Sequence, residues 1–495
     1  MFKKILIANR GEIAVRIIRA CRELDIETVA VYSEADRSAL HVQEADEAVC
    51  IGPASPGESY LNMDKIIQAA QITKAEAIHP GYGFLAENYK FSQRCKEEGI
   101  IFIGPNPQAQ KLVGDKVAAR KTLSRQNVPI IPGMKSTSKD FQIYKSAAEE
   151  IGYPVMIKAS AGGGGKGMRI VPSPERLKRS IEEGRREAGS AFGDDSIYLE
   201  KCIVNPRHIE FQVLADEHGK SIHLFERECS IQRRHQKIVE ETPSTALNTQ
   251  LREKMGEVAL NVVKATGYTN AGTVEFLLDE NKNFYFLEVN ARIQVEHPIT
   301  ELVTGVDLVK WQIRIAAGEK LTLRQDALAQ RGHAIESRIY AEDPANNFFP
   351  SLGNIQIMQN PNGPGVRVDS GIYSGYEVPR FYDPILSKLI TWGENREISR
   401  KRMICALTDY IIMGIETTVP FLRDVMKHPD FIKGKTATNF IEKNFLCWNN
   451  KKDSKHVVPA LIAAAVCGQD SQNAPEYTLR KAYNPWTIVG KWSVG

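Results

Sequence analysis

The chain has 495 residues, of which 42% are hydrophobic and 25% are charged. A chain of this length exceeds one ordinary hydrophobic core, so the sequence predicts about three domains of a globular protein and excludes a small module or a disordered segment. The formal net charge is +4, and basic and acidic residues are mixed along the chain, so neither a nucleic-acid partner nor a membrane partner is indicated.

The eight cysteines are scattered and form no CxxC pair, which argues against a zinc site and a disulfide framework. The apolar run from Ile5 to Ala8 is too short for a signal peptide, and the run at 457–468 is too short to span a bilayer. We therefore expect a cytoplasmic protein.

Five short β-rich runs alternate with helical patterns at the start of the chain, at 4–9, 27–33, 47–52, 75–81 and 100–105. This alternation predicts a doubly wound α/β domain over residues 1–115. The first strand-to-helix turn reads Asn9-Arg10-Gly11-Glu12 and lacks the G-x-G-x-x-G that lets a backbone approach a pyrophosphate. NAD binding is therefore disfavoured.

A second block, residues 116–203, contains YPVMIKASAGGGGKGMRIV, which predicts a strand, a glycine-rich loop and a second strand. Backbone N–H groups of such a loop can surround a phosphate, although a flexible linker has the same composition. Lys166 is followed by Gly167 and not by Ser or Thr, so the loop is not a Walker A motif. Lys158 is predicted to lie at the mouth of the loop, where a phosphate would offset its desolvation.

A third block, residues 204–446, is richer in strands, among them HIEFQVLAD, SIHLFERECS, GTVEFLLD and NFYFLEVN. The composition changes at residue 447, and the tail 447–495 combines a polar linker with an aromatic end. Exposed aromatic residues are typical binding anchors, so a partner-docking tail and a segment folded back on the domain both remain open.

The stretch GTVEFLLDENKNFYFLEVN predicts a β-hairpin. If its turn is 280–283, Glu275 lies directly opposite Glu288, and a divalent cation would relieve the repulsion between them. Oxygen ligands from Glu275, Glu288 and Asn290 suit Mg²⁺ or Mn²⁺. The alternative is two solvated carboxylates on an exposed sheet.

Polar and apolar residues alternate in EVNARIQVEH, residues 288–297. If this stretch is extended, its polar row faces either water, as on an edge strand, or a substrate. The stretch SIQRRHQK, residues 230–237, gathers positive charge that suits a small anion, although such a patch is more often a solvated surface.

Together these stretches resemble the biotin carboxylase component of biotin-dependent carboxylases, an ATP-grasp enzyme. The resemblance covers residues 1–446 and includes IANRGEIAVRI, AIHPGYGFLAEN, IKASAGGGGKGM, ERECSIQRRHQKIVEE, EVNARIQVEHPITE and ESRIYAEDP. It implies an N-terminal α/β domain, a small ATP-grasp lid and a larger C-terminal ATP-grasp domain.

The resemblance also implies a role for individual residues. Nucleotide binding falls to Lys116, Lys158, Gly164, Gly165, Glu200, Lys201, Cys202, Ile203, His208, Gln232 and His235. The implied metal ligands are Glu275, Glu288 and Asn290. Bicarbonate would be held by Lys237, Arg292, Gln294 and Val295, with Glu296 as its base and Arg338 facing biotin.

The sequence departs from the family pattern at Ala161, where many members have Gly, and at Lys166, where many have Arg. No Ala-Met-Lys-Met biotinylation segment is present, so biotin is expected on a separate carrier protein, with a separate carboxyltransferase subunit. The implied reaction uses ATP and bicarbonate to form carboxyphosphate and then carboxybiotin, as the first half of acyl-CoA or pyruvate carboxylation.

Two rival interpretations are another ATP-grasp carboxylate ligase and a non-catalytic nucleotide-binding subunit. The first does not explain the RIQVE and ESRI stretches, and the second is expected to lack some of the residues named above. The sequence does not identify the final carboxyl acceptor or the oligomeric state, although homodimers are common in the family.

Overall fold

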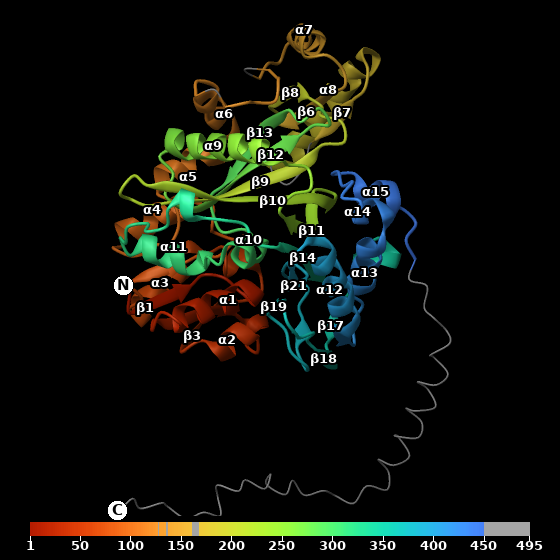
Figure 1. Cartoon of the computed structure of the whole chain (residues 1–495). Coiled ribbons are helices and arrows are strands. Elements are labelled where there is room, and N and C mark those ends of the chain that lie inside the picture. Colours follow the sequence, from red (N-terminus) through yellow and green to blue (C-terminus); the bar gives the residue numbers. More distant parts are fainter. Residues whose placement is uncertain (127, 135–136, 161–167, 450–495) are drawn as a thin grey trace, which may run out of the picture. The chain divides into compact units, whose positions relative to one another are not determined.

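The computed structural model describes residues 1–126, 128–134, 137–160 and 168–449. Five parallel strands form the centre of the N-terminal domain (Figure 1), in the order β3-β2-β1-β4-β5. They are β1 Lys4–Ile7, β2 Glu27–Ser33, β3 Glu47–Gly52, β4 Ala77–His79 and β5 Ile101–Phe102. The helices of this domain are α1 Gly11–Arg22, α2 Leu40–Glu44, α3 Met63–Thr73, α4 Tyr89–Glu97 and α5 Pro107–Gly114.

Alternate residues of β1 enter two different cores, as a sheet covered on both faces requires. Ile5 packs in a cluster with Ile17 of α1, whereas Leu6 packs in a cluster with Ile66 of α3. The predicted doubly wound α/β domain is therefore confirmed. The cluster around Ile5 also contains Leu214, so the N-terminal domain shares one core with the large sheet described below.

The turn at Asn9 and Arg10 is occupied by contacts within its own domain. The Asn9 amide donates to the carbonyl oxygens of Pro80 and Tyr82, both at 2.7 Å, and Arg10 forms an ion pair of 2.6 Å with Asp36. These contacts tie the turn to the segment that follows β4 and to the turn after β2 within the N-terminal domain.

The lid contains a three-stranded sheet in the order β7-β6-β8, with β6 Val155–Ala159, β7 Arg169–Val171 and β8 Ile197–Lys201. Its helices are α6 Lys116–Ser124, α7 Phe141–Ile151 and α8 Pro174–Phe192. Tyr144, Ile157 and Leu177 lie in one buried cluster that joins α7 and α8 to β6. The predicted glycine cradle, residues 161–167, lies outside the described residues.

An eight-stranded antiparallel sheet dominates the rest of the chain, in the order β13-β12-β9-β10-β11-β14-β21-β19. Its strands are β9 Arg207–Ala215, β10 Ser221–Arg233, β11 Gln236–Thr242, β12 Asn270–Leu278, β13 Phe284–Asn290, β14 His333–Tyr340, β19 Val366–Ser370 and β21 Ile385–Gly393. Helix α9, Thr249–Thr266, covers one face (Figure 1), where Met255 packs in a cluster with Phe211 and Phe276.

The remaining elements connect and extend this sheet. The helices are α10 His297–Thr304, α11 Leu308–Ala316, α12 Arg396–Asp409, α13 Val419–Lys427, α14 Pro429–Ile432 and α15 Phe440–Asn444. The short strands are β15 Glu342–Asp343, β16 Phe349–Pro350, β17 Gly353–Asn354, β18 Ile357–Gln359, β20 Glu377–Val378 and β22 Ile411–Met413. The 3₁₀ turns are η1 Glu34–Asp36, η2 Pro56–Glu58, η3 Gln325–Ala327 and η4 Pro344–Asn346.

The β12–β13 hairpin corrects one prediction and confirms another. Its loop has five residues, 279–283, and not the predicted four, so Leu278 pairs with Phe284. A β-bulge at Leu287 then shifts the register by one residue and places Glu275 opposite Glu288 after all. The strand ends at Asn290, so residues 291–296 are not part of the sheet.

The compact unit that contains these sheets spans Met1–Trp448. Trp448 packs its ring on Phe421 and donates from its indole nitrogen to Asp424 at 2.9 Å. Among the described residues, all seven cysteines are free thiols, and no helix is both long enough and apolar enough to cross a membrane.

Candidate active site

Three carboxylates form a row across the large sheet. Glu288 on β13 pairs with Glu275 on β12, and Glu275 pairs with Glu210 on β9. Directly paired residues present their side chains on the same face, so the three carboxylates share one surface of the sheet. Glu275 is only 4% exposed, Glu210 is fully buried and Glu288 is half-buried, so Glu275 and Glu288 do not lie on a fully solvated face of the sheet.

Lys237 of β11 supplies the positive charge that this row needs. Its Nζ lies 2.6 Å from Glu210, 2.9 Å from Glu275 and 2.7 Å from Glu296. Burial disfavours the charged ammonium, but the three carboxylates outweigh this effect and raise the pKa of Lys237 well above its usual value. Lys237 therefore joins the residues predicted to bind metal to those predicted to bind bicarbonate.

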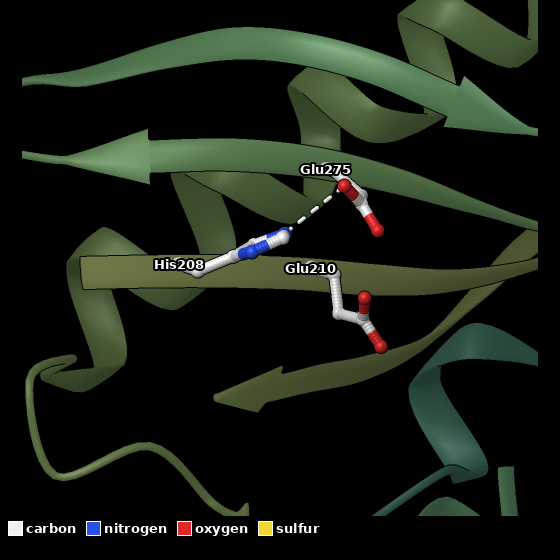
Figure 2. A group of neighbouring side chains, drawn as sticks. All are labelled: His208, Glu210 and Glu275. Atoms are coloured by element: carbon white, nitrogen blue, oxygen red, sulfur yellow. Dashed lines mark ion pairs between the residues drawn. The ribbon is translucent and has the colours of Figure 1, made fainter. Parts of the chain in front are cut away.

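His208 lies beside the same row. Figure 2 shows His208 and Glu210 on β9 and Glu275 on the neighbouring β12, with an ion pair of 3.0 Å between His208 Nε2 and Glu275. The other ring nitrogen of His208 lies 2.7 Å from the amide nitrogen of Gln232. Burial raises the pKa of Glu275, but Lys237 and His208 oppose this effect and hold the pKa well below its usual range.

The polar row that follows β13 faces the same site. Arg292 donates to Gln294 at 3.0 Å and to Asn290 at 3.3 Å, and Gln294 donates to Glu275 at 3.4 Å. The alternating residue Ile293 is fully buried in the core shared with the N-terminal domain. The solvated-edge interpretation of this stretch is therefore wrong, and its alternation persists beyond the end of the strand.

Arg338 of β14 completes the site beside Glu296. Its guanidinium donates to Glu240 at 2.6 Å and to Glu296 at 2.9 Å. Burial raises the pKa of Glu296, but Lys237 and Arg338 outweigh this effect and hold the pKa well below its usual range. Glu296 is thus a buried carboxylate that remains charged at neutral pH.

The predicted positive patch at 230–237 does not act as one surface. Arg233 forms an ion pair of 2.9 Å with Glu342 and lies over the ring of Phe348, whereas Lys237 points into the site. Arg234 and His235 form the turn between β10 and β11, with φ of 49° and 67°. Arg233 pairs with Gln236, whereas Lys237 pairs with Gln232. Because neighbouring residues of a strand point to opposite faces, Arg233 and Lys237 lie on opposite faces of the β10–β11 pair.

The lid places two predicted nucleotide residues in contact. Lys158 Nζ lies 2.6 Å from Glu200, and Arg120 forms a second ion pair with that carboxylate. Lys201 instead donates to the carbonyl oxygens of Gly152 and Tyr153, at 2.8 and 3.1 Å.

Other predicted nucleotide residues are less fully placed. Cys202 is buried, and Ile203 is half-buried. Burial lowers the pKa of His235, and the nearby charges of Lys158 and His208 lower it further. Gly164 and Gly165 lie outside the described residues, as does the side chain of Lys116.

Several residues of the site were not predicted from the sequence. Arg227 is fully buried and donates to Glu210 at 2.6 Å, Glu240 holds Arg338, and Glu87 forms an ion pair of 3.1 Å with Arg292. The polar alternation in HIEFQ could have suggested Glu210. Glu87 and Glu240 lie far along the chain from their partners, and no local pattern marks them.

The donor atoms at the row fit a hard divalent cation. Glu275 and Glu288 offer carboxylate oxygens, and Asn290 offers an amide oxygen at the end of the same strand as Glu288. Such oxygen donors match Mg²⁺ and Mn²⁺. Closer groups of potential ligands in the described part of the chain, such as His208, Glu210 and Glu275, are already neutralised in part by Lys237.

Three domains of known families match the chain. Residues 1–110 match "Biotin carboxylase, N-terminal domain", residues 115–324 match "Carbamoyl-phosphate synthase L chain, ATP binding domain", and residues 336–443 match "Biotin carboxylase C-terminal domain". The biotin carboxylase of Nostoc sp. is 54% identical over 442 residues, which cover 89% of this chain and 99% of the relative. The chain belongs to the biotin carboxylase family. It is an ATP-dependent ligase that carboxylates biotin.

Other biotin carboxylases agree in sequence and fold. Biotin carboxylase 1 of Bacillus subtilis is 54% identical over 443 residues, which cover 89% of this chain and 98% of the relative. The biotin carboxylase domain dimer of Hydrogenobacter thermophilus 2-oxoglutarate carboxylase, solved with MgADP, ADP and bicarbonate, has a TM-score of 0.87 and 50% identity, covering 91% of this chain and 100% of that one. The Campylobacter jejuni biotin carboxylase complex has a TM-score of 0.87 and 46% identity, covering 90% and 99%.

Proposed function

We propose that the described residues divide biotin carboxylation into nucleotide binding, bicarbonate activation and carboxyl transfer. The observation that carries this proposal is the position of Lys237 Nζ, 2.9 Å from Glu275 and 2.7 Å from Glu296. One ammonium thus connects the proposed metal ligands to the proposed base, so that a γ-phosphate and a bicarbonate would meet beside it. Phosphoryl transfer depends mainly on such positioning and charge stabilisation.

The nucleotide would bind between the lid and the large sheet. Lys116 and Lys158 would contact its phosphates and Gly164 and Gly165 would close over them. The remaining nucleotide contacts are assigned to Glu200, Lys201, Cys202, Ile203, His208, Gln232 and His235. Support comes from the lid contact of Lys158 with Glu200 and from the contacts of His208 with Gln232 and Glu275.

Bicarbonate would lie against Lys237, Arg292, Gln294 and Val295, with Glu296 as its general base. Because the Val295 side chain has no polar atom, its share in binding an anion is limited to its backbone. Arg292 and Gln294 already contact each other, which limits the entropy lost on binding. Deprotonated bicarbonate would attack the γ-phosphate and form carboxyphosphate with release of ADP.

Arg338 would hold biotin during carboxyl transfer. Carboxyphosphate would release CO₂ and phosphate, phosphate would take the N1′ proton of biotin, and Arg338 would stabilise the enolate-like oxygen. A guanidinium that is held in place is well suited to this role. The Arg338 guanidinium is held by Glu240, to which it donates at 2.6 Å.

A divalent cation at Glu275, Glu288 and Asn290 would neutralise charge on the transferred phosphoryl group. The role of the chain itself is to present these oxygens on adjacent strands.

Free biotin tests the proposal directly. The chain should cleave ATP in a reaction that requires bicarbonate and is stimulated by free biotin, with carboxybiotin as a product. ATP cleavage driven by another carboxylate, with no effect of biotin, would instead support a different ATP-grasp ligase and overturn the proposal.

The proposed partners follow from the same chemistry. We propose that biotin is presented by a carrier outside these 495 residues, that a carboxyltransferase takes the carboxyl group to an acyl-CoA or a 2-oxo acid, and that the chain forms a homodimer in the cytoplasm. The biotin carboxylase domain of the Hydrogenobacter relative, a dimer, supports the homodimer.

A further inference from the structure

Lys388 of β21 is a fully buried lysine outside the residues assigned above. Its ammonium lies 3.1 Å from Glu12 of α1 and 3.7 Å from Asp369 of β19. It also donates to the backbone carbonyl oxygen of Val295 at 2.9 Å. A buried ammonium is costly unless paired and hydrogen-bonded, and these three oxygens come from three separate parts of the chain.

The contact with Val295 reaches the proposed bicarbonate clamp. The carbonyl oxygen of Val295 belongs to the peptide that joins Val295 to Glu296, so Lys388 holds the plane of that peptide. Lys388 also lies directly opposite Arg338 in the β14–β21 ladder, and Arg338 donates to the Glu296 carboxylate at 2.9 Å. Lys388 and Arg338, which are paired across this ladder, thus hold the peptide before Glu296 and the Glu296 carboxylate.

The turn at the start of α1 positions the Glu12 carboxylate beside Lys388. Gly11 in this turn has a φ of +65°, and the turn lies against Gly371, which directly follows β19. A Cβ added at Gly371 would lie 2.6 Å from the backbone nitrogen of Glu12. This close approach carries the Glu12 carboxylate to Lys388, while Tyr82 donates to its other oxygen.

We propose that Lys388, anchored by Glu12 and Asp369, is a positioning residue for the bicarbonate clamp. It sets the direction in which Glu296 leaves the backbone and so aligns the base with bicarbonate. This inference rests on the proposed function of Glu296. A purely structural ion pair between domains would account for Glu12 and Asp369, but it would not require the bond to Val295.

The test is the Lys388→Met variant, which keeps an unbranched side chain without the ammonium. We expect its KM for bicarbonate to rise at least about tenfold and kcat to fall by about 10–100-fold, because a shift of about 1 Å in a reacting group has effects of this size. The KM for ATP should change less than about threefold, since Lys388 touches no proposed nucleotide residue. Arg252→Met, which removes the half-buried partner of the buried Glu226 carboxylate at 2.8 Å, is the control and should leave the bicarbonate KM unchanged.

A double variant keeps the test decisive if Lys388→Met does not fold. Lys388→Met with Glu12→Gln removes both buried charges and should fold, while still losing the bond to Val295. An unchanged bicarbonate KM and kcat in either folded variant, or an equal rise in both KM values, would overturn the positioning role. Absence of bicarbonate-dependent ATP cleavage in the unmodified chain would instead refute the proposed function, so the two failures are distinguishable.

Discussion

Glu275 and Glu288 lie directly opposite each other on β12 and β13, although the loop between the strands is one residue longer than this pairing requires. The bulge at Leu287 absorbs the extra residue. Bulges increase local twist and re-aim side chains, and they are frequent beside active sites. The bulge here brings the two carboxylates together at the position where the proposed cation would bind.

Glu288→Gln should abolish ATP turnover, because it removes one negative ligand of the cation that neutralises the phosphates. A loss of several kcal/mol of transition-state stabilisation corresponds to a decrease of about 10²-fold or more. Magnesium titration of bicarbonate-dependent ADP release measures it. Glu280→Gln, in the exposed loop of the same hairpin, is the control and should behave like the unmodified chain. Undiminished turnover with unchanged metal dependence would refute the assignment.

Glu296→Gln should retain ATP binding but lose bicarbonate-dependent ATP cleavage by about 10²–10⁴-fold, the usual contribution of a general base. Arg338→Ala should keep part of this cleavage and lose carboxybiotin, because Arg338 is assigned to the second step. ADP and carboxybiotin are both measured for each variant. Equal losses of the two products in both variants would contradict separate roles.

Glu240 makes the stability of the fold depend on pH. Burial raises its pKa from 4.5 to about 7, although the Arg338 guanidinium opposes the shift. Since the protonated form is favoured in the fold, the contribution of Glu240 to stability is complete below pH 4.5 and is lost as the pH rises through 7. Glu240→Gln imitates the protonated form at every pH, so the variant does not lose this contribution. The difference between the unfolding free energies of the variant and the unmodified chain should therefore increase, in favour of the variant, by up to about 3 kcal/mol between pH 5 and pH 8. Denaturant unfolding at both pH values measures this, and a constant difference would contradict it.

Arg207→Met should lower the free energy of unfolding by about 3–5 kcal/mol, because it leaves the buried Glu228 carboxylate without its main partner. Arg207 donates to both oxygens of Glu228 at 2.6 Å, and to Gly434 and Thr436 at 3.0 and 2.9 Å. Denaturant unfolding is the measurement. The exposed Arg324→Met should cost less than about 1 kcal/mol. Equal small losses in both would show that the Arg207 pair contributes little.

Removal of residues 449–495, which lie almost entirely outside the described part of the chain, tests whether the tail docks a partner subunit, one of the two possibilities that the sequence leaves open. Trp448 belongs to the compact unit, so the truncated chain should end there. It should carboxylate free biotin at an ordinary rate but fail to co-purify with the carrier or the carboxyltransferase, because aromatic anchors such as Trp486 are lost. Normal assembly would contradict the docking role, and misfolding would support a segment that folds back.

Local sequence patterns were sufficient to predict much of the fold. Strands such as 27–33 and 47–52 were predicted with the bounds that the structure has, because β-branched and apolar runs between turn residues are local signals. The pairing of Glu275 with Glu288 was also predicted, although from a four-residue turn that is wrong. Periodicity reports which face a residue occupies, but a bulge has no periodic signature.

The tertiary structure decided which of these side chains meet. Lys237 contacts Glu210 and Glu296, which come from β9 and from the loop before α10, and Lys388 contacts Glu12 from the opposite end of the chain. The large sheet places its strands in an order that differs from their order in the sequence. A single sequence specifies the charge of each residue and the face of the strand or helix on which it lies. The neighbours of a buried charge depend instead on strand order and domain packing. These are set by the burial of apolar residues across the whole chain.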